Sequence, residues 1–141
     1  MIRVALSLLL ITILFSCQSE LQEIIEERWE DGSPRIVRTY APSADTLIMV
    51  KEVSYYPNGQ VRLKGSFLEG ERHGHWVYYY ENGMRWSEGH YVNGLEDKKR
   101  RVWHHNGQLN YEGMFRMGKK VGVWRFFDEH GNLITEEDYG N

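Results

Sequence analysis

The pattern that decides the fold is Gly65-Ser66-Phe67-Leu68-Glu69-Gly70, in which a ring follows the first glycine by two residues and a second glycine closes the motif. The pattern returns 24 residues later as Gly89-His90-Tyr91-Val92-Asn93-Gly94, and again as Gly113-Met114-Phe115-Arg116-Met117-Gly118. The same step separates Gly59, Gly83, Gly107 and Gly131, and it places a further ring at Tyr139. A fixed period of this length indicates stacked copies of one supersecondary unit.

The period also sets the boundaries of the units. Full units begin at about residues 56, 80 and 104, and a partial last unit covers 128–141. A degenerate earlier copy spans 29–55, where Gly32 and Tyr40 keep the separation of Gly59 and Phe67. The step from this copy to the next is three residues longer, and we expect residues 42–45 to form a bulging loop that absorbs the difference. The repeat domain is predicted to cover 23–141.

Asn-Gly pairs predict that each unit is a β-hairpin. Asn58-Gly59, Asn82-Gly83 and Asn106-Gly107 lie between aromatic-rich runs, and Asn-Gly is favoured in two-residue type I′ turns. A two-residue turn at Asn82-Gly83 sets Tyr79 opposite Trp86, Tyr78 opposite Ser87 and Trp76 opposite Gly89.

This register predicts how the sheet is packed. We expect the Trp76 indole to lie over the bare backbone of Gly89, because an aromatic ring can cover a strand glycine on a neighbouring strand. Trp76 and Trp124 are therefore predicted to be buried. Alternate residues of a strand point to opposite faces, so Lys64, Glu88 and Glu112 are expected to be solvated on the other face.

These residues resemble the variant form of the MORN (membrane occupation and recognition nexus) repeat, whose pattern also includes Gly74-His75-Trp76 and Gly122-Val123-Trp124. The resemblance implies an all-β fold, an elongated single-layer antiparallel meander of 24-residue hairpins. The structural positions it implies are Gly65, Phe67, Trp76, Gly89, Tyr91, Gly113, Phe115 and Trp124. It also implies a binding role, because bacterial members are often described as antitoxin-like proteins that bind a partner. The chain departs from the pattern at Lys98, Arg100 and Glu137, which replace a glycine, a tryptophan and a glycine.

The first 17 residues predict export. They contain one base, no acid and an apolar run that is too short to span a membrane, which is typical of a signal peptide. The run ends in Leu14-Phe15-Ser16-Cys17, which resembles a bacterial lipobox, and Cys17 is the only cysteine. We expect Cys17 to be lipidated and residues 18–22 to form a polar tether; the alternative is an ordinary signal peptide with a chance cysteine. The predicted location is the bacterial cell envelope, anchored by lipid in either the outer or the cytoplasmic membrane.

Composition and motifs argue against several function classes. The 17 Lys and Arg are outnumbered by 20 Asp and Glu, which is not typical of a nucleic-acid-binding protein. Residues 113–120 approach a phosphate-binding loop, but Lys120 stands where a hydroxyl residue should bind Mg²⁺ and a strand-like run follows. No nucleophile elbow or metalloprotease motif occurs, so no catalytic residue, small-molecule substrate or cofactor is predicted.

The histidines suggest a metal site only weakly. His73 and His75 alternate and His104 and His105 are adjacent, but a tight site needs three or four fixed ligands and no cysteine is left to contribute. We interpret these histidines as polar turn residues and predict no metal.

Three function classes remain. The first is a non-enzymatic envelope module that binds a protein partner, such as a toxin; the second is a membrane-surface structural or phospholipid-binding scaffold; the third is an enzyme. The basic run Lys98, Lys99, Arg100 and Arg101 is a candidate site for an acidic partner, since it is the densest positive stretch of the chain. Its alternative interpretation is a solvated turn, in which Arg100 faces Gly113.

Overall fold

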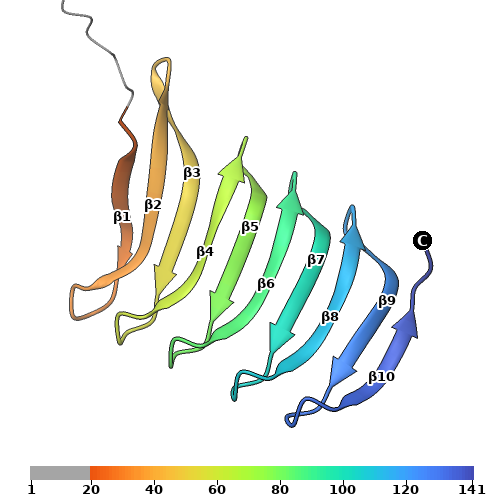
Figure 1. Ribbon diagram of the computed structural model, residues 1–141. Coiled ribbons are helices and arrows are strands. Elements are labelled where there is room, and N and C mark those ends of the chain that lie inside the picture. Colours follow the sequence, from red (N-terminus) through yellow and green to blue (C-terminus); the bar gives the residue numbers. More distant parts are fainter. Residues whose placement is uncertain (1–19) are drawn as a thin grey trace, which may run out of the picture.

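The computed structural model describes residues 20–141, so the predicted signal peptide, Cys17 and the start of the tether lie outside the described residues. These residues form one open antiparallel sheet of ten strands that follow one another in sequence order (Figure 1). The strands are β1 (Gln22–Arg28), β2 (Pro34–Ser43), β3 (Thr46–Tyr55), β4 (Val61–Leu68), β5 (Glu71–Tyr79), β6 (Arg85–Val92), β7 (Leu95–Trp103), β8 (Leu109–Arg116), β9 (Lys119–Phe127) and β10 (Leu133–Asp138). The all-β, single-layer meander is confirmed. Within 20–141 no helix is long and apolar enough to span a bilayer.

The turn type predicted for the Asn-Gly pairs is wrong. Gly83 has a positive φ but Asn82 does not, and the hairpin closes with the Tyr80 N–H donating to the Met84 carbonyl. The loop therefore holds three residues, and the Asn82 side chain stabilises it by accepting the Met84 N–H at 2.9 Å. The turns at the other ends of the strands have positive φ at both central residues, as type I′ requires. These turns are Glu69-Gly70, Asn93-Gly94 and Met117-Gly118.

The predicted register nevertheless survives in the body of the hairpin. Tyr78 pairs with Ser87 and Trp76 with Gly89, as predicted, but Tyr79 pairs with Arg85 rather than with Trp86. Trp86 is an unpaired bulge residue that offsets the longer turn. The same irregularity recurs one unit earlier at Arg62 and one unit later at Asn110.

A second bulge, near the middle of each unit, bends the later strand of the hairpin. Gly65 on β4 stands against Gly74, His75 and Trp76 on β5, because the flanking pairs are Lys64 with Val77 and Ser66 with His73. Gly74 takes a left-handed conformation at φ 76°, and Gly122 does so in β9. Lys98 holds the equivalent place in β7 with φ 67°, a conformation that costs a non-glycine residue roughly 1–2 kcal/mol.

The bulge turns the Trp76 ring onto the preceding strand. The prediction that this ring covers Gly89 is therefore wrong. A Cβ at Gly65 would lie 2.1 Å from the Trp76 ring, and one at Gly113 would lie 2.1 Å from the Trp124 ring. Gly89, although it pairs with Trp76, is covered by Arg100 of β7, whose Nη1 would lie 3.1 Å from a Cβ there. Likewise Arg100 pairs with Gly113 but does not cover it.

The two indoles form the core of this single layer, and their burial agrees with the prediction. Trp76 is 0% exposed and Trp124 is 2% exposed. The Trp76 Nε1 donates to the Ser66 carbonyl at 3.1 Å, and Phe67 meets the ring edge-on with centroids 5.2 Å apart. Tyr91, Leu63 and Tyr78 complete the cluster.

Successive turns are joined to one another by side-chain hydrogen bonds. The Tyr56 hydroxyl donates to the Tyr79 carbonyl at 2.8 Å, and the Tyr80 hydroxyl donates to the Trp103 carbonyl at 2.7 Å. His104, one unit further on, places Nε2 3.0 Å from the Phe127 carbonyl. These three turns are thereby fixed to the next unit along the sheet.

Residues 42–45 do not form the predicted bulging loop. Pro42 pairs with Leu47 and Ser43 with Thr46, so the extra residues lengthen both strands of the β2–β3 hairpin. Figure 1 shows this hairpin rising above the others. Pairing satisfies backbone groups that an unpaired loop would leave to solvent.

The covered glycine can be tested by comparing Gly65→Ala with Gly89→Ala. We expect Gly65→Ala to lower the free energy of unfolding by about 1–3 kcal/mol, because the rigid Trp76 ring occupies the site of the new methyl group. Gly89→Ala should have a much smaller effect, since the flexible Arg100 side chain can move aside. Denaturant unfolding of both variants measures the difference, and a larger loss for Gly89→Ala would contradict this packing.

Relief of strain at Lys98 gives a second test. We expect Lys98→Gly to stabilise the protein by about 0.5–1 kcal/mol, the strain removed less the added chain entropy of glycine. Lys99→Gly is the matched control, because Lys99 has no positive φ and glycine there should destabilise. Equal effects of the two substitutions in denaturant unfolding would show that Lys98 is unstrained.

Candidate functional site

One face of the sheet, here called the aromatic face, carries Trp76, Trp124 and the rings packed on them. Hollows of about 230, 340 and 280 Å³ follow one another along it. Their walls are rings with interspersed cations. The first is lined by Trp29, Arg35, Ser54, Tyr55, Tyr56 and Arg62, and the second by Tyr56, Arg62, Leu63, Tyr78, Tyr79 and Trp86.

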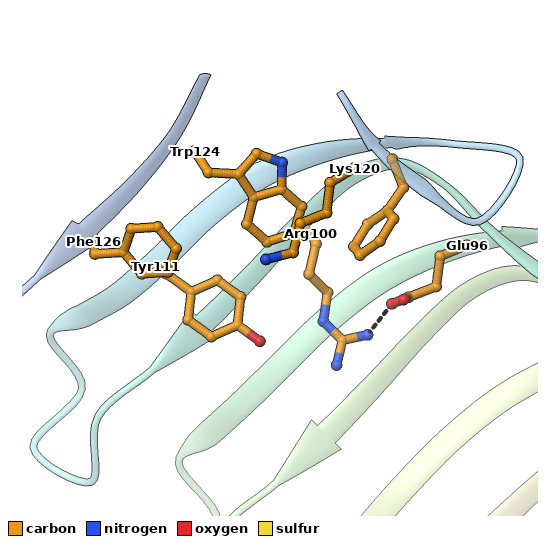
Figure 2. Close-up of a pocket in the computed structure, with 7 residues that line it drawn as sticks. Glu96, Arg100, Tyr111, Lys120, Trp124 and Phe126 are labelled. Carbon is orange, nitrogen blue, oxygen red and sulfur yellow. Dashed lines mark hydrogen bonds and ion pairs between the residues drawn. The ribbon is translucent and has the colours of Figure 1, made fainter. Parts of the chain in front are cut away.

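The third hollow is present where the repeat departs from its pattern. It is lined by Glu96, Arg100, Tyr111, Phe115, Lys120, Trp124 and Phe126, and Figure 2 shows these side chains beneath the arched strands. Arg100 stands in the place of a core tryptophan, and its Nη1 donates to Glu96 Oε1 at 2.7 Å. A flat guanidinium fills less of the site than an indole would.

The exchange at Arg100 is matched by a second exchange four residues earlier. In the unit before, the Arg72 guanidinium lies 4.3 Å from the centre of the Trp76 ring, and in the unit after, Lys120 Nζ lies 4.4 Å from that of Trp124. In the middle unit an acid, Glu96, replaces this cation and an arginine replaces the ring. The charge partner has thus changed together with the core residue, so the favourable contact is kept.

The bulge residues supply lining of the hollows that sequence reasoning missed. Trp86 is 45% exposed, and both Trp86 and Arg62 line the second hollow. Positions 62, 86, 110 and 134 hold Arg, Trp, Asn and Ile, and the positions on either side of them also vary from unit to unit. The 24-residue pattern therefore gives no signal that singles out the bulge residues.

Several cations of the aromatic face have no carboxylate partner among residues 20–141. Arg62 Nε donates to the Ser54 hydroxyl at 3.3 Å, and Arg72 Nη1 donates to the Tyr78 hydroxyl at 3.1 Å. Lys120 Nζ donates to the Tyr139 hydroxyl at 3.1 Å. Burial raises the pKa of Tyr78, while nearby Arg72 opposes the shift, so this hydroxyl stays a neutral acceptor. The face therefore offers positive charge between rings at Arg62 and Arg72, whereas the Tyr139 hydroxyl links Lys120 to the Glu137 carboxylate.

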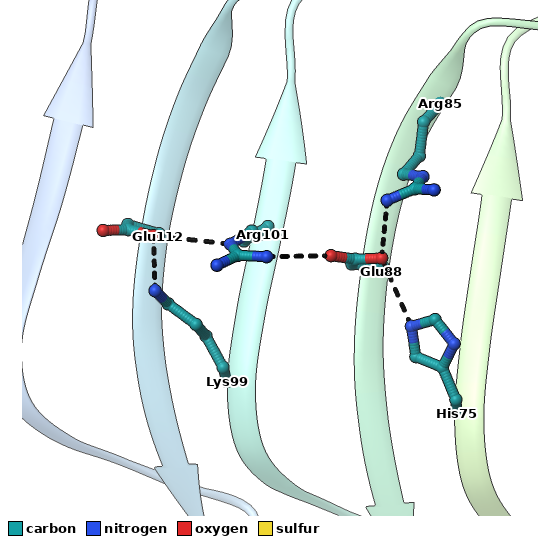
Figure 3. A network of polar contacts seen from close by, with 6 residues as sticks. All are labelled: His75, Arg85, Glu88, Lys99, Arg101 and Glu112. Atoms are coloured by element: carbon teal, nitrogen blue, oxygen red, sulfur yellow. Dashed lines mark hydrogen bonds and ion pairs between the residues drawn. The ribbon is translucent and has the colours of Figure 1, made fainter.

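The opposite face, here called the charge face, carries an ion-pair network, so the prediction that Glu88 and Glu112 are solvated is wrong. Their side chains are 13% and 20% exposed. Glu88 contacts His75 at 3.3 Å, Arg85 at 2.9 Å and Arg101 at 3.3 Å (Figure 3). Hydrogen bonding from Lys99 at 2.8 Å is the main cause that lowers the pKa of Glu112.

The basic run does not form the single patch that was predicted, and it is not a turn. All four residues lie in β7, and the alternation of the strand divides them between the two faces. Lys99 and Arg101 pair with Glu112 and Glu88 on the charge face, whereas Arg100 pairs with Glu96 on the aromatic face. Much of the positive charge of the run is therefore neutralised within the protein.

The interpretation of the histidines as turn residues is only partly correct. His73 and His75 are in β5 and not in a turn. His105 does lie at a turn, where it stacks on Tyr80 with ring centroids 3.7 Å apart. In the part of the chain that the structure describes, no three potential metal-ligating side chains gather at one point. Residues 113–120 form the end of β8, a tight turn and the start of β9.

Comparison with known proteins agrees with this architecture. The profile of the MORN repeat variant matches four segments, residues 50–69, 72–93, 96–117 and 120–141. A search of curated proteins finds no match to the chain. The matched segments cover more than half of the chain and follow the hairpin units of the sheet. The chain therefore belongs to the MORN repeat variant family, and MORN repeats are typical of binding or structural modules.

Proposed function

We propose that the protein is a non-enzymatic, lipid-anchored binding module of the bacterial cell envelope, and that its aromatic face holds an acidic protein partner. A toxin neutralised by this chain is the kind of partner that fits an antitoxin-like or immunity-like role. The observation that carries the proposal is the row of ring-walled hollows on a face that no other layer of residues 20–141 covers.

The composition of the face supports a protein partner. Exposed aromatic and methionine side chains are enriched where proteins bind each other, and Trp86 and Tyr139 are 45% and 42% exposed. Hot spots of binding energy are commonly tryptophan, tyrosine and arginine set in pockets. Trp86 and Arg62 together give the second hollow this character.

Charge supports an acidic partner. Arg62 and Arg72 bond to hydroxyl groups rather than to carboxylates, so their charge is free to act on an approaching molecule. Lys120 is linked to the Glu137 carboxylate only through the Tyr139 hydroxyl. Complementary charge raises association rates more than it raises affinity.

The lipid anchor rests on the sequence Leu14-Phe15-Ser16-Cys17. β1 begins at Gln22, so few residues separate Cys17 from the sheet, and a lipidated Cys17 would hold the module close to the membrane. Acyl chains anchor a protein without spanning the bilayer, with about 0.8 kcal/mol per buried methylene.

The anchor is tested by mass spectrometry of the mature N-terminus. We expect a chain that begins at a lipid-modified Cys17, and a Cys17→Ser variant that is not processed there. A free thiol at residue 17, or cleavage at another bond, would contradict the lipoprotein assignment.

The binding face is tested by photo-crosslinking in cells from two positions of similar exposure, 45% and 43%. A photoreactive residue at Trp86 on the aromatic face should give a protein adduct, whereas one at Met114 on the charge face should not. With the partner purified, Arg62→Glu/Lys120→Glu should lower its association rate by about tenfold at low salt. Lys51→Glu/Lys64→Glu, with the same change of charge, is the control. A protein adduct from Met114 alone would exclude this face, and a lipid adduct alone from Trp86 would favour the membrane scaffold.

A further inference from the structure

The strand β10 lies at an open edge of the sheet. Among residues 20–141 it pairs only with β9 (Figure 1), and all of its residues are exposed. Leu133 and Ile134 are large apolar residues on this edge, 53% and 66% exposed. An edge strand presents unpaired backbone N–H and C=O groups, which another extended chain can satisfy by adding a strand.

The ion pairs of the charge face end on this strand. Directly paired residues across β6 to β10 are Glu88, Arg101, Glu112, Arg125 and Glu136, so acid and base alternate from strand to strand. Arg125 Nε lies 2.7 Å from Glu136 Oε1. Glu88 contacts Arg101 of β7, and Glu112 contacts Lys99 and Arg101 of the same strand. Glu136 contacts Arg125 of β9, and among residues 20–141 no strand lies on its other side. A base on an added strand would continue the alternation.

The residue of β10 on the aromatic face also favours a basic residue on an added strand. Glu137 occupies the position of Gly65, Gly89 and Gly113, and in each of those cases a side chain of the following strand lies over the glycine. The Glu137 carboxylate accepts a hydrogen bond from the Tyr139 hydroxyl at 2.5 Å. A carboxylate at this point leaves no flat surface for a ring but offers a partner for a cation.

We infer that the β10 edge is a second docking surface, which takes an extended basic segment of another protein with two consecutive Arg or Lys residues. The first base lies over Glu137 and the second stands opposite Glu136. The internal precedent is β7, where Arg100 covers Gly89 and the adjacent Arg101 pairs with Glu88. This inference does not rest on the proposed function, because it concerns the edge of the sheet and a partner of opposite charge.

A second copy of this chain fits the edge poorly. The other open strand, β1, contains Glu23, Glu26 and Glu27, so joining β1 to β10 would bring like charges together. Joining two β10 strands would do the same. The chain's own pair of consecutive arginines lies in β7, which is already paired on both edges.

The test uses a fluorescent peptide with the sequence of β7, residues 95–103, in which Thr replaces the acids at 96 and 97. We expect it to bind the protein in a fluorescence anisotropy titration, with affinity that falls as salt rises. Glu136→Gln/Glu137→Gln should weaken binding by about tenfold, as loss of two exposed ion pairs implies. Glu20→Gln/Glu23→Gln at the other end of the sheet is the matched control and should leave binding unchanged. Circular dichroism checks that both variants fold.

Two altered peptides separate strand pairing from simple charge attraction. Backbone N–H groups of an extended peptide point alternately to its two edges. One peptide is N-methylated at the residues whose N–H groups point to one edge, and the second peptide at those whose N–H groups point to the other edge. We expect one form to bind like the parent and the other to lose binding. Absence of parent binding, equal loss in the two methylated forms, or equal weakening by the control variant would each overturn the inference. None of these outcomes affects the crosslinking from Trp86, so the two proposals can fail separately.

Discussion

The contact of one indole with the bare backbone of a glycine on the preceding strand holds this sheet together. A single-layer sheet has no second layer in which to bury apolar surface, and very few large side chains here are fully buried. The bulge at Gly74 allows the contact, because the added residues swing Trp76 over Gly65 instead of over its paired residue, Gly89. Trp124 and Gly113 repeat the arrangement two units later. Between them, Arg100 uses the same bulge geometry with a charged plane, so a unit without the ring still fits the array.

The two faces of the sheet are stabilised by different interactions. On the charge face, alternating acids and bases in one row favour a single register, since a slip by one residue would move this row to the other face. On the aromatic face, rings provide burial and leave a row of hollows. The exchange of a core tryptophan for Arg100 therefore places a charged group in the lining of one hollow and preserves the fold around it.

The sequence predicts the architecture well because the evidence for it is repeated. Glycines and rings that recur at one step indicate hairpins, and the pairs Tyr78 with Ser87 and Trp76 with Gly89 follow from them. The turn types were wrong for a physical reason: Asn82 accepts a backbone N–H with its side chain, so it does not need the positive φ that Asn-Gly otherwise suggests. The prediction of which glycine Trp76 covers was wrong because it depends on the bulge at Gly74. A glycine allows the positive φ of this bulge, but its presence in the sequence does not show that a bulge forms. The basic run does not form one patch because side chains alternate along β7, so charges adjacent in sequence lie on opposite faces.

The bonds between successive turns also determine how the molecule responds to force. A pull applied across the array, between β1 and β10, acts on a meander in which each strand contacts only its neighbours. The load reaches one hairpin at a time, so ladder bonds break in sequence rather than together. The hydroxyl of Tyr56 or Tyr80, bonded to the next unit, must be released before its hairpin can open. Extension should therefore proceed in steps of one unit, each releasing about 80 Å of chain, the reach of 24 extended residues.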